Sequence, residues 1–555
     1  MHAIHLLTLA LLVPPAVNAQ ADREWATYYG DTGNELGTGC AVDTEGNVYL
    51  GGSTASPAGI ASGGYQMTYA GGAFDAFLAK FDDTGARLWA TYYGGADLDA
   101  VTSVAVDGTD VYIAGQTISA TGIAFNAHQD TFAGAMDLFL AKFNGAGQLQ
   151  WATYYGGIGQ EQGARCAVDP DGNVYLSGTT QSPTTSAIAD GGHQNTYGGG
   201  LYEAFLVKFS PTGQRLWGTY YGGTGSDIGS CCAVDTAGNV YLSGQTFSAT
   251  GIAYAGHDTV VGPSSEAFLV KFDPDGSRLW GTYYAGAQGG GYGHACATDA
   301  SGAVYLSGQT QSSIEVAYLG HQSVYGGAAD SYLAKFNGSG ERLWATYYGG
   351  MASEWTAMLA VNDSGQVLMA GTTYSGTAIA AAGHKDAFGG DHDAFLIRFD
   401  ASGTRLSGTY YGGPEGDLGA AVATAAGTQA VYLSGTAASL VAIAYGGHQD
   451  TFGGGPKDAF LVKFDDAIAT DISPDEVLSS PTLTLFPSPS DGLVNIGGTP
   501  LGARSIHFDN SLGQCVLTSA IAASIDITPL APGAYIVTVL DGRGIILARS
   551  RMVRH

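Results

Sequence analysis

The sequence predicts an all-β protein: a seven-bladed β-propeller closed by its own N-terminal strand, followed by a small C-terminal β-sandwich. Three short motifs each occur seven times, at intervals of 62 to 66 residues between successive copies of the first motif. The 86 glycines, with 32 Tyr and 21 Phe, are typical of many short strands joined by tight turns. A chain of 555 residues also exceeds the size of one ordinary core, which favours a repeat array or several domains.

Residues 1–19 are predicted to form a secretory signal peptide. The stretch from Leu6 to Ala16 is apolar, and the small residues needed around a cleavage site lie at Val17 and Ala19, before Gln20. No later apolar run approaches the ~20 residues that a membrane-spanning helix requires. We therefore expect an exported protein without a transmembrane segment.

The three repeated motifs define the structural unit that follows. The second motif, Val-Tyr-Leu or a close variant, first begins at Val48 and last at Val431. The third, (Asp/Glu)-x-(Phe/Tyr)-Leu-x-(Lys/Arg)-Phe, first ends at Phe81 and last at Phe464. The first motif, Trp-(Ala/Gly)-Thr-Tyr-Tyr, begins at Trp25, Trp89, Trp151, Trp217, Trp280 and Trp344, with Ser407 in the seventh copy.

Each repeat is predicted to contain four antiparallel strands. In the third motif both alternating faces are apolar: Phe77, Ala79 and Phe81 share one face, while Ala76 and Leu78 share the other. A strand that is covered on both faces belongs to a sheet packed between two other sheets. This is the environment of a propeller blade, and short Asp-, Gly- and Asn-rich turns between the strands agree with it.

The two ends of the array predict how the ring closes. The array opens with a copy of the first motif at residues 25–30, before any copy of the other strands. It ends at Phe464, the last residue of the third motif, with no copy of the first motif after it. The N-terminal strand is therefore expected to complete the last blade, which removes the open sheet edges that favour aggregation. This places the propeller at residues 20–465.

The recurring Asn-Val-Tyr-Leu-Ser-Gly and Ala-Phe-Leu-Val-Lys-Phe segments resemble the SBBP-type, seven-bladed β-propeller repeat of secreted bacterial proteins. The resemblance covers about four-fifths of the chain. It implies the propeller fold and leaves the function open, because propellers host many unrelated functions.

The end of the chain is predicted to be a linker at residues 466–484 and a compact β-sandwich at residues 485–555. Pro474 and Pro481 interrupt the polar linker, and short alternating strands with turn signals follow it. A generic accessory domain is the plain interpretation of such a sandwich.

Three segments of this sandwich resemble the C-terminal sorting domain carried by cargo of the bacterial type IX secretion system. They are Phe486-Pro-Ser-Pro-Ser-Asp-Gly492, Leu530-x-x-Gly533-x-Tyr535 and the basic tail from Arg549 to Arg554. The chain departs from the family pattern by having Phe486 for Tyr, Ser488 for Asn and Arg instead of Lys in the tail. The resemblance implies that type IX machinery is a partner and that the protein is secreted or held at the outer cell surface.

Composition and motifs exclude several function classes. The net charge of −28 repels phosphate backbones, so a nucleic-acid partner is not expected. The sequence has no nucleophile elbow, zinc-protease helix or phosphate-binding loop. Four cysteines share one repeat position, where they are expected to be small buried side chains rather than disulfides: Cys40, Cys166, Cys232 and Cys296.

A carboxylate precedes the cysteine position by five residues in six of the seven repeats. Each of these carboxylates is expected at the start of the innermost strand of its blade, close to the central channel of the propeller. Six carboxylates at the mouth of that channel are candidate ligands for Ca²⁺, the one cofactor that the sequence suggests. The alternative is a structural role, in which each carboxylate accepts backbone N–H bonds within its own loop. The six are Glu35, Asp99, Glu161, Asp227, Glu354 and Asp417, and Gly291 replaces the carboxylate in the fifth repeat.

A histidine recurs once per repeat in the long connection between the second and third strands. Tyr65 replaces it in the first repeat, which favours aromatic packing or hydrogen bonding over a metal site. The six are His128, His193, His257, His321, His384 and His448.

The fifth repeat departs most from the others and supplies the candidate ligand site. Tyr292 and His294 follow a glycine run there, and the neighbouring repeat contributes Glu354 and Trp355, the one tryptophan outside the repeated position. An exposed Trp beside a carboxylate suits stacking on a sugar face while the acid bonds the sugar hydroxyls. These residues lie on the face formed by the long loops, where binding sites concentrate.

The sequence thus favours a secreted or cell-surface module that binds glycans or proteins. A secreted polysaccharide lyase or hydrolase and a passive structural protein of the cell surface are the alternatives. Nearly regular repetition favours binding or structure over catalysis, because a reaction requires one asymmetric group of residues.

Overall fold

The computed structural model describes residues 22–465 except 127, 184, 287 and 289, and also residues 484–486, 492–497, 503–510, 515–522, 524–541 and 546–554. The chain divides into two compact units, Met1–Ile468 and Ala469–His555. The predicted signal peptide at residues 1–19 lies outside the described residues, and so does the predicted linker except for its last residue.

The first unit contains antiparallel four-stranded sheets, and in all but the last of them neighbouring strands follow one another in sequence. Sheet 1 holds β2 (Glu35–Val42), β3 (Val48–Thr54), β4 (Asp75–Phe81) and β5 (Arg87–Tyr93). Sheet 2 holds β6 (Asp99–Asp107), β7 (Asp110–Thr117), β8 (Asp137–Phe143) and β9 (Leu149–Tyr155). Sheet 3 holds β10 (Glu161–Val168), β11 (Val174–Thr180), β12 (Glu203–Phe209) and β13 (Arg215–Tyr221), with the short α1 (Thr185–Ile188) between β11 and β12.

The later sheets repeat this order. Sheet 4 holds β14 (Asp227–Val234), β15 (Val240–Thr246), β16 (Glu266–Phe272) and β17 (Arg278–Tyr284). Sheet 5 holds β18 (Tyr292–Thr298), β19 (Val304–Thr310), β20 (Asp330–Phe336) and β21 (Arg342–Tyr348). Sheet 6 holds β22 (Glu354–Val361), β23 (Val367–Thr373), β24 (Asp393–Phe399) and β25 (Arg405–Tyr411). Sheet 7 holds β26 (Asp417–Thr424), β27 (Val431–Ala437) and β28 (Asp458–Asp465).

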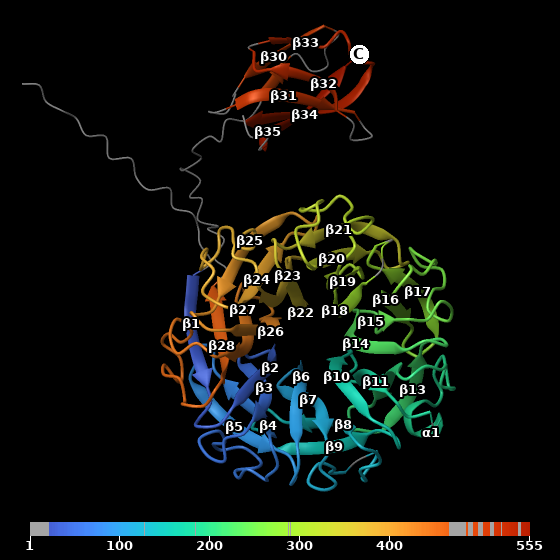
Figure 1. Cartoon of the computed structure of the whole chain (residues 1–555), viewed down its shortest axis with the longest axis vertical. Helices are drawn as coiled ribbons and strands as arrows, with labels where there is room; N and C mark the ends of the chain where they lie inside the picture. Colours follow the sequence, from blue (N-terminus) through green and yellow to red (C-terminus); the bar gives the residue numbers. More distant parts are fainter. Residues whose placement is uncertain are drawn as a thin grey trace, which may run out of the picture. The chain divides into compact units, whose positions relative to one another are not determined.

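The N-terminal strand β1 (Asp22–Tyr29) supplies the fourth strand of sheet 7. It pairs antiparallel with β28, with Tyr29 opposite Ala459 and Asp22 opposite Asp465. The prediction that this strand completes the last sheet is confirmed. Figure 1 shows the sheets following one another around a ring, with the first strand of each sheet on the inner side.

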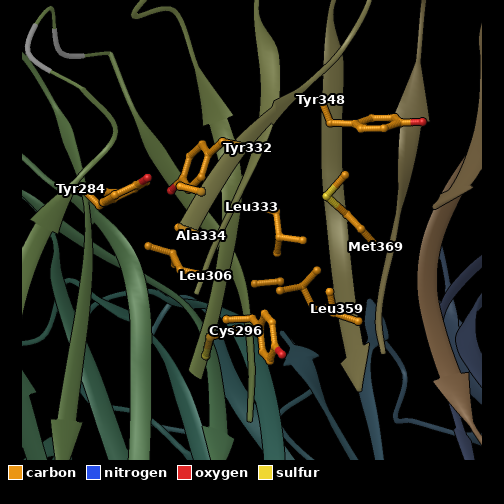
Figure 2. Packing of buried hydrophobic residues seen from close by; sticks show 14 of the residues in the cluster. Tyr284, Cys296, Leu306, Tyr332, Leu333, Ala334, Tyr348, Leu359 and Met369 are labelled. Atoms are coloured by element: carbon orange, nitrogen blue, oxygen red, sulfur yellow. The ribbon is translucent and has the colours of Figure 1, made fainter. Parts of the chain in front are cut away.

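Neighbouring sheets are joined by the residues of the first motif. The Trp217 indole N–H donates to the Pro274 carbonyl of the next sheet at 3.0 Å, and the Tyr221 hydroxyl donates to the Ile252 carbonyl. Figure 2 shows the apolar part of such a contact, where Tyr332 and Leu333 of sheet 5 lie between Tyr284 of sheet 4 and Met369 of sheet 6. Burial on both faces of each sheet therefore explains why the third motif, between its acidic first residue and its Lys or Arg, is apolar on both faces.

A β-bulge interrupts every inner strand at the same place. In β18 the register shifts between Gly293 and Ala295, which leaves His294 as the extra residue. The corresponding shift in β10 falls between Gln162 and Arg165. A bulge bends its strand and redirects the side chains around it, and here these side chains line the centre of the ring.

The second unit contains two further sheets. One orders β29 (Thr484–Phe486), β30 (Leu493–Gly497) and β33 (Ser524–Asp526), and the other orders β32 (Cys515–Ala520), β31 (Ala503–Asp509), β34 (Gly533–Asp541) and β35 (Ile546–Arg554). Its core includes the fully buried Val494, Ile506, Phe508, Val537 and Met552. Within the described residues of both units, no helix has the length and apolar character needed to span a membrane.

Candidate functional site

A cavity of about 710 Å³ lies among the inner strands of the first unit. Its volume is within the range of small-molecule binding sites. The inner strands of all seven sheets contribute to its wall, with apolar side chains such as Leu36, Ile228 and Leu418 and polar ones such as Gln116 and Gln162. The wall is thus suited to a ligand that has both apolar faces and hydroxyl groups.

Trp355 lines this cavity from β22 and remains 53% exposed. Its ring contacts Tyr374 at 6.4 Å between ring centres. The six tryptophans at the repeated position are all buried, because they pack between sheets. Trp355 therefore presents a large aromatic surface to solvent that the fold itself does not use.

His294 lines the same cavity from the bulge in β18, and Tyr292 stacks on it with ring centres 5.8 Å apart and planes inclined by 20°. Burial, and then the charge of Arg165, lower the pKa of His294 to about 4. The imidazole is therefore neutral near pH 7, with one nitrogen that donates and one that accepts a hydrogen bond. Tyr292 is 39% exposed and does not line the cavity wall.

Glu354 precedes Trp355 in β22, but its carboxylate is fully buried. It accepts hydrogen bonds from the Thr373 hydroxyl at 2.8 Å and the Gly350 N–H at 3.0 Å. Successive side chains of a strand point to opposite faces, so Glu354 and Trp355 cannot contact the same sugar. The structure brings Trp355 and His294 to one cavity and leaves Glu354 outside it.

Arg165 is a site residue that was not predicted from the sequence. It lines this cavity and also a second one of about 300 Å³ further along the inner strands. The sequence could have identified Arg165 if the seven repeats had been compared at the first paired position after each bulge. The equivalents of Arg165 there are uncharged: Gly39, Ser103, Cys231, Ala295, Met358 and Ala421.

The six carboxylates of the predicted calcium ring lie at the starts of their inner strands and are fully buried. Each is held by its own sheet. Glu35, for example, accepts hydrogen bonds from the Thr54 and Ser56 hydroxyls, both at 2.7 Å, and from the Asp31 N–H at 3.1 Å. Burial raises the pKa of Glu35 even though these bonds oppose the rise.

Each of these six carboxylates also faces a second one, which begins the third strand of the preceding sheet. A Cβ on Gly156 would lie 2.4 Å from Asp137 Oδ1 and 2.5 Å from Glu161 Oε2, so only glycine fits between them. The Asp137 oxygen has no hydrogen-bond partner among the described residues. The six pairs are Asp458 with Glu35, Asp75 with Asp99, Asp137 with Glu161, Glu203 with Asp227, Asp330 with Glu354 and Asp393 with Asp417.

Two interfaces break this pattern of paired carboxylates. Lys385 places its ammonium 3.2 Å from Asp393 Oδ2 and so brings a positive charge to one pair. Gly291 leaves Glu266 without an opposing carboxylate, although burial still raises the pKa of Glu266 to about 7. In the part of the chain that the structure describes, no three His, Cys, Asp or Glu side chains are grouped as metal ligands.

The repeated histidines pack against aromatic rings. His128 meets Phe209 edge-on at 6.0 Å between ring centres, and His448 meets Phe81 at 6.2 Å. Tyr65, which replaces the histidine in the first repeat, meets Phe143 in the same way at 6.3 Å. The prediction of a packing role for this position is confirmed.

The cysteines at the repeated position are buried and reduced, as the sequence predicted. Four of them line the smaller cavity, together with Cys231. Burial raises the pKa of Cys40 to about 12 and that of Cys166 to about 11. The Cys40 and Cys166 thiols therefore resist ionisation, in agreement with a packing role at the repeated position.

Comparison with known protein families identifies two modules. The β-propeller repeat of the SBBP type matches residues 24–57 and 150–183. The secretion system C-terminal sorting domain matches residues 484–550. These matches confirm both resemblances that the sequence suggested.

Individual similar proteins are distant. An uncharacterised WD repeat-containing protein of Acanthamoeba polyphaga mimivirus is 22% identical over 420 residues, and the match spans 63% of this chain but only 30% of that protein's length. The polysaccharide lyase Uly1 aligns over 79% of this chain and 90% of its own, with 11% identity and a TM-score of 0.40. PorZ, a surface component of the type-IX secretion system of Porphyromonas gingivalis, aligns over 95% and 75% with 13% identity and a TM-score of 0.25.

Proposed function

Because this chain carries SBBP-type β-propeller repeats and a type IX C-terminal sorting domain, we propose that it is a surface-delivered binding module that takes a glycan in its central cavity. The sorting domain directs the chain to the cell surface or beyond it. The observation that carries the proposal is the exposed indole of Trp355 at the wall of a cavity of about 710 Å³.

We also propose how the chain is divided into domains. We assign residues 20–465 to a closed seven-bladed propeller, residues 466–484 to a linker and residues 485–555 to the sorting domain. Pairing of β1 with β28 supports the closure. Long connections, such as residues 55–74 between β3 and β4, supply the face at which a ligand enters.

The chemistry of the wall favours a carbohydrate over a protein ligand. An aromatic ring stacks on the apolar face of a sugar, while amide, hydroxyl and neutral imidazole groups bond its hydroxyls. Trp355, Gln116, Gln162 and His294 supply these groups within one cavity. A protein partner would instead need a broad surface with buried anchor residues.

An enzymatic role, as a polysaccharide lyase or hydrolase, is the alternative. It requires a general acid or base in contact with the ligand. His294 is the titratable group of the wall, and its low pKa makes it a weak base near pH 7. The buried Glu354 does not reach the cavity. These features favour binding without chemistry.

Calcium, which the sequence suggested for a ring of six inner-strand carboxylates, stays a proposal, and we now place it where each of them faces a second carboxylate. The carboxylate pairs at the interfaces between sheets supply hard oxygen ligands and excess negative charge. A bound Ca²⁺ at these pairs would stabilise the ring and would not take part in ligand binding.

The test is an array of immobilised polysaccharides and bacterial surface proteins probed with the purified full chain, in Ca²⁺ and in chelator. Retention and released products are both measured. We expect retention on one class of polysaccharide without products, and loss of that retention in Trp355→Ala. Retention on proteins alone, or retention unchanged by Trp355→Ala, would contradict the proposal, and released sugars would establish an enzyme.

A further inference from the structure

The guanidinium of Arg165 has no hydrogen bond or ion pair within the described part of the chain. The repeated lysines show the usual alternative. Lys80 lies 2.9 Å from Asp43, and Lys335 lies 3.0 Å from Asp299. Arg165 is half-buried on a cavity wall, so its guanidinium donors face water or a ligand instead of a protein acceptor.

Arg165 is also the one charged side chain on the wall of the larger cavity as described, and no carboxylate lines that cavity. Its charge acts within the cavity, because it lowers the pKa of His294 after the larger effect of burial. The net charge of the whole chain is −28, yet the carboxylates nearest the ring centre are buried and held by their own sheets. The cavity is thus a locally cationic site in an acidic protein.

The fold does not require this arginine. Six other sheets have Gly, Ser, Cys, Ala or Met at the equivalent position and keep the same strand pairing around it. Arg165 is therefore the one charged residue among seven equivalent positions. Such a departure from the repeat can bind one part of a ligand specifically. The planar guanidinium offers two parallel donors to a carboxylate or sulfate.

We propose that Arg165 determines specificity in the central cavity and selects acidic saccharides, pairing with a uronate carboxylate or a sulfate ester. This inference rests on the proposed function, because it names the ligand class of the same cavity. The Trp355 indole stacks on the apolar face of a sugar ring. Gln116, Gln162 and the neutral His294 form hydrogen bonds with the sugar hydroxyls. Arg165 gives the wall one cationic partner, so one acidic group of the ligand pairs directly with the cavity.

Calorimetric titration of the full chain with oligogalacturonate and with its fully methyl-esterified form tests the selection. A hydrogen-bonded ion pair contributes at least roughly tenfold in affinity, so we expect the acid to bind at least ten times more tightly than the ester. Arg165→Gln should reduce the affinity for oligogalacturonate to that for its methyl ester, and it should leave the affinity for the ester unchanged. Trp355→Ala should weaken both, and Lys457→Gln, a matched loss of one positive charge off the cavity wall, should weaken neither.

Phenylglyoxal modification supplies a readout that does not depend on oligosaccharide binding. Sulfate or glucuronate should slow the modification of Arg165, measured by peptide mass spectrometry against the other arginines, while glucose at the same concentration should not. Protection by sulfate alone assigns sulfated sugars, and protection by glucuronate alone assigns uronates. No protection by either anion overturns the inference.

The two failures are distinguishable. If both oligosaccharides bind equally and Arg165→Gln changes neither affinity, acidic selection is wrong and the glycan-binding function stands. If neither oligosaccharide nor any polysaccharide binds but Arg165 is protected by an anion, the glycan function is wrong and the anion site stands.

Discussion

Replacing Glu203 with glutamine is expected to stabilise the first unit, with a gain that grows as the pH rises. Glu203 is fully buried, and its Oε2 has no hydrogen-bond partner among the described residues. Burial, and then the charge of Asp227, raise the pKa of Glu203 from 4.5 to about 8. A carboxyl with a raised pKa stabilises the folded state below the unfolded pKa, and this contribution is lost as the pH rises through the folded pKa.

The magnitude follows from the two pKa values. Each pKa unit corresponds to about 1.4 kcal/mol, so the folded state is penalised by about 4 kcal/mol at pH 8 and by less than about 1 kcal/mol at pH 5. A glutamine has no proton to hold, and it retains an oxygen for the Gln194 N–H, which donates to Glu203 at 2.9 Å. The free-energy cost of the raised pKa is therefore an upper limit on the stabilisation by Glu203→Gln.

Thermal unfolding of the full chain and the variant at pH 5 and pH 8 measures this effect. The entropy of unfolding is roughly 2 cal/mol/K per residue, so each kcal/mol moves the Tm of a unit of this size by roughly 1 °C. We expect Glu203→Gln to raise Tm by a few degrees at pH 8 and by roughly 1 °C or less at pH 5. A loss of stability, or an equal change at both pH values, would refute the reasoning.

Two variants serve as controls. Glu266→Gln should behave similarly but with a smaller gain, because Gly291 leaves Glu266 without an opposing carboxylate. Asp43→Asn should have the opposite sign. Burial opposes ionisation of Asp43, but hydrogen bonds from Lys80 and Asn47 lower its pKa, so its ionised form stabilises the folded state at pH 8.

Three further outcomes are expected. Trp217→Ala should destabilise the first unit by about 3–5 kcal/mol, since its ring is buried between sheets, whereas Trp355→Ala should leave Tm unchanged. Thermal unfolding of both variants checks this, and equal losses would contradict it. In the native chain a thiol reagent should label Cys515, the exposed cysteine, and leave the five buried ones until denaturant is added; rapid native labelling of Cys40 or Cys166 would oppose it. Added Ca²⁺ should raise Tm more at pH 8 than at pH 5, since burial raises the pKa of carboxyls in these pairs, to about 6 for Asp137 and about 7 for Asp458, and calorimetry showing no binding at pH 8 would exclude calcium.

The strands of the first unit were predictable because burial on both faces gives every repeat the same apolar pattern. The pairing of β1 with β28 followed from the position of the first Trp motif, and the exposure of Trp355 followed from its place outside that motif. The His128 position was predictable as packing because Tyr65 replaces it in one repeat.

The paired carboxylates were not predictable, because the two members come from different repeats and meet only across a sheet interface. The burial of Glu354 away from the cavity was not predictable for a simpler reason. Adjacent residues of a strand face opposite sides, and the sequence alone did not show which side was the cavity. Arg165 was missed because it differs from the other repeats by a single substitution. That substitution is visible only when the seven inner strands are aligned at their bulges, and the positions of the bulges come from the structure.

The most direct test of the central claim is the tryptophan fluorescence of the full chain during titration with the polysaccharide that it retains. Trp355 is the exposed tryptophan of the described structure, at 53%, while the six at the repeated position are buried. We predict a saturable change in emission that is lost in Trp355→Phe, with weaker binding in that variant. An unchanged emission response in Trp355→Phe, at unchanged affinity, would place the ligand elsewhere and contradict the account.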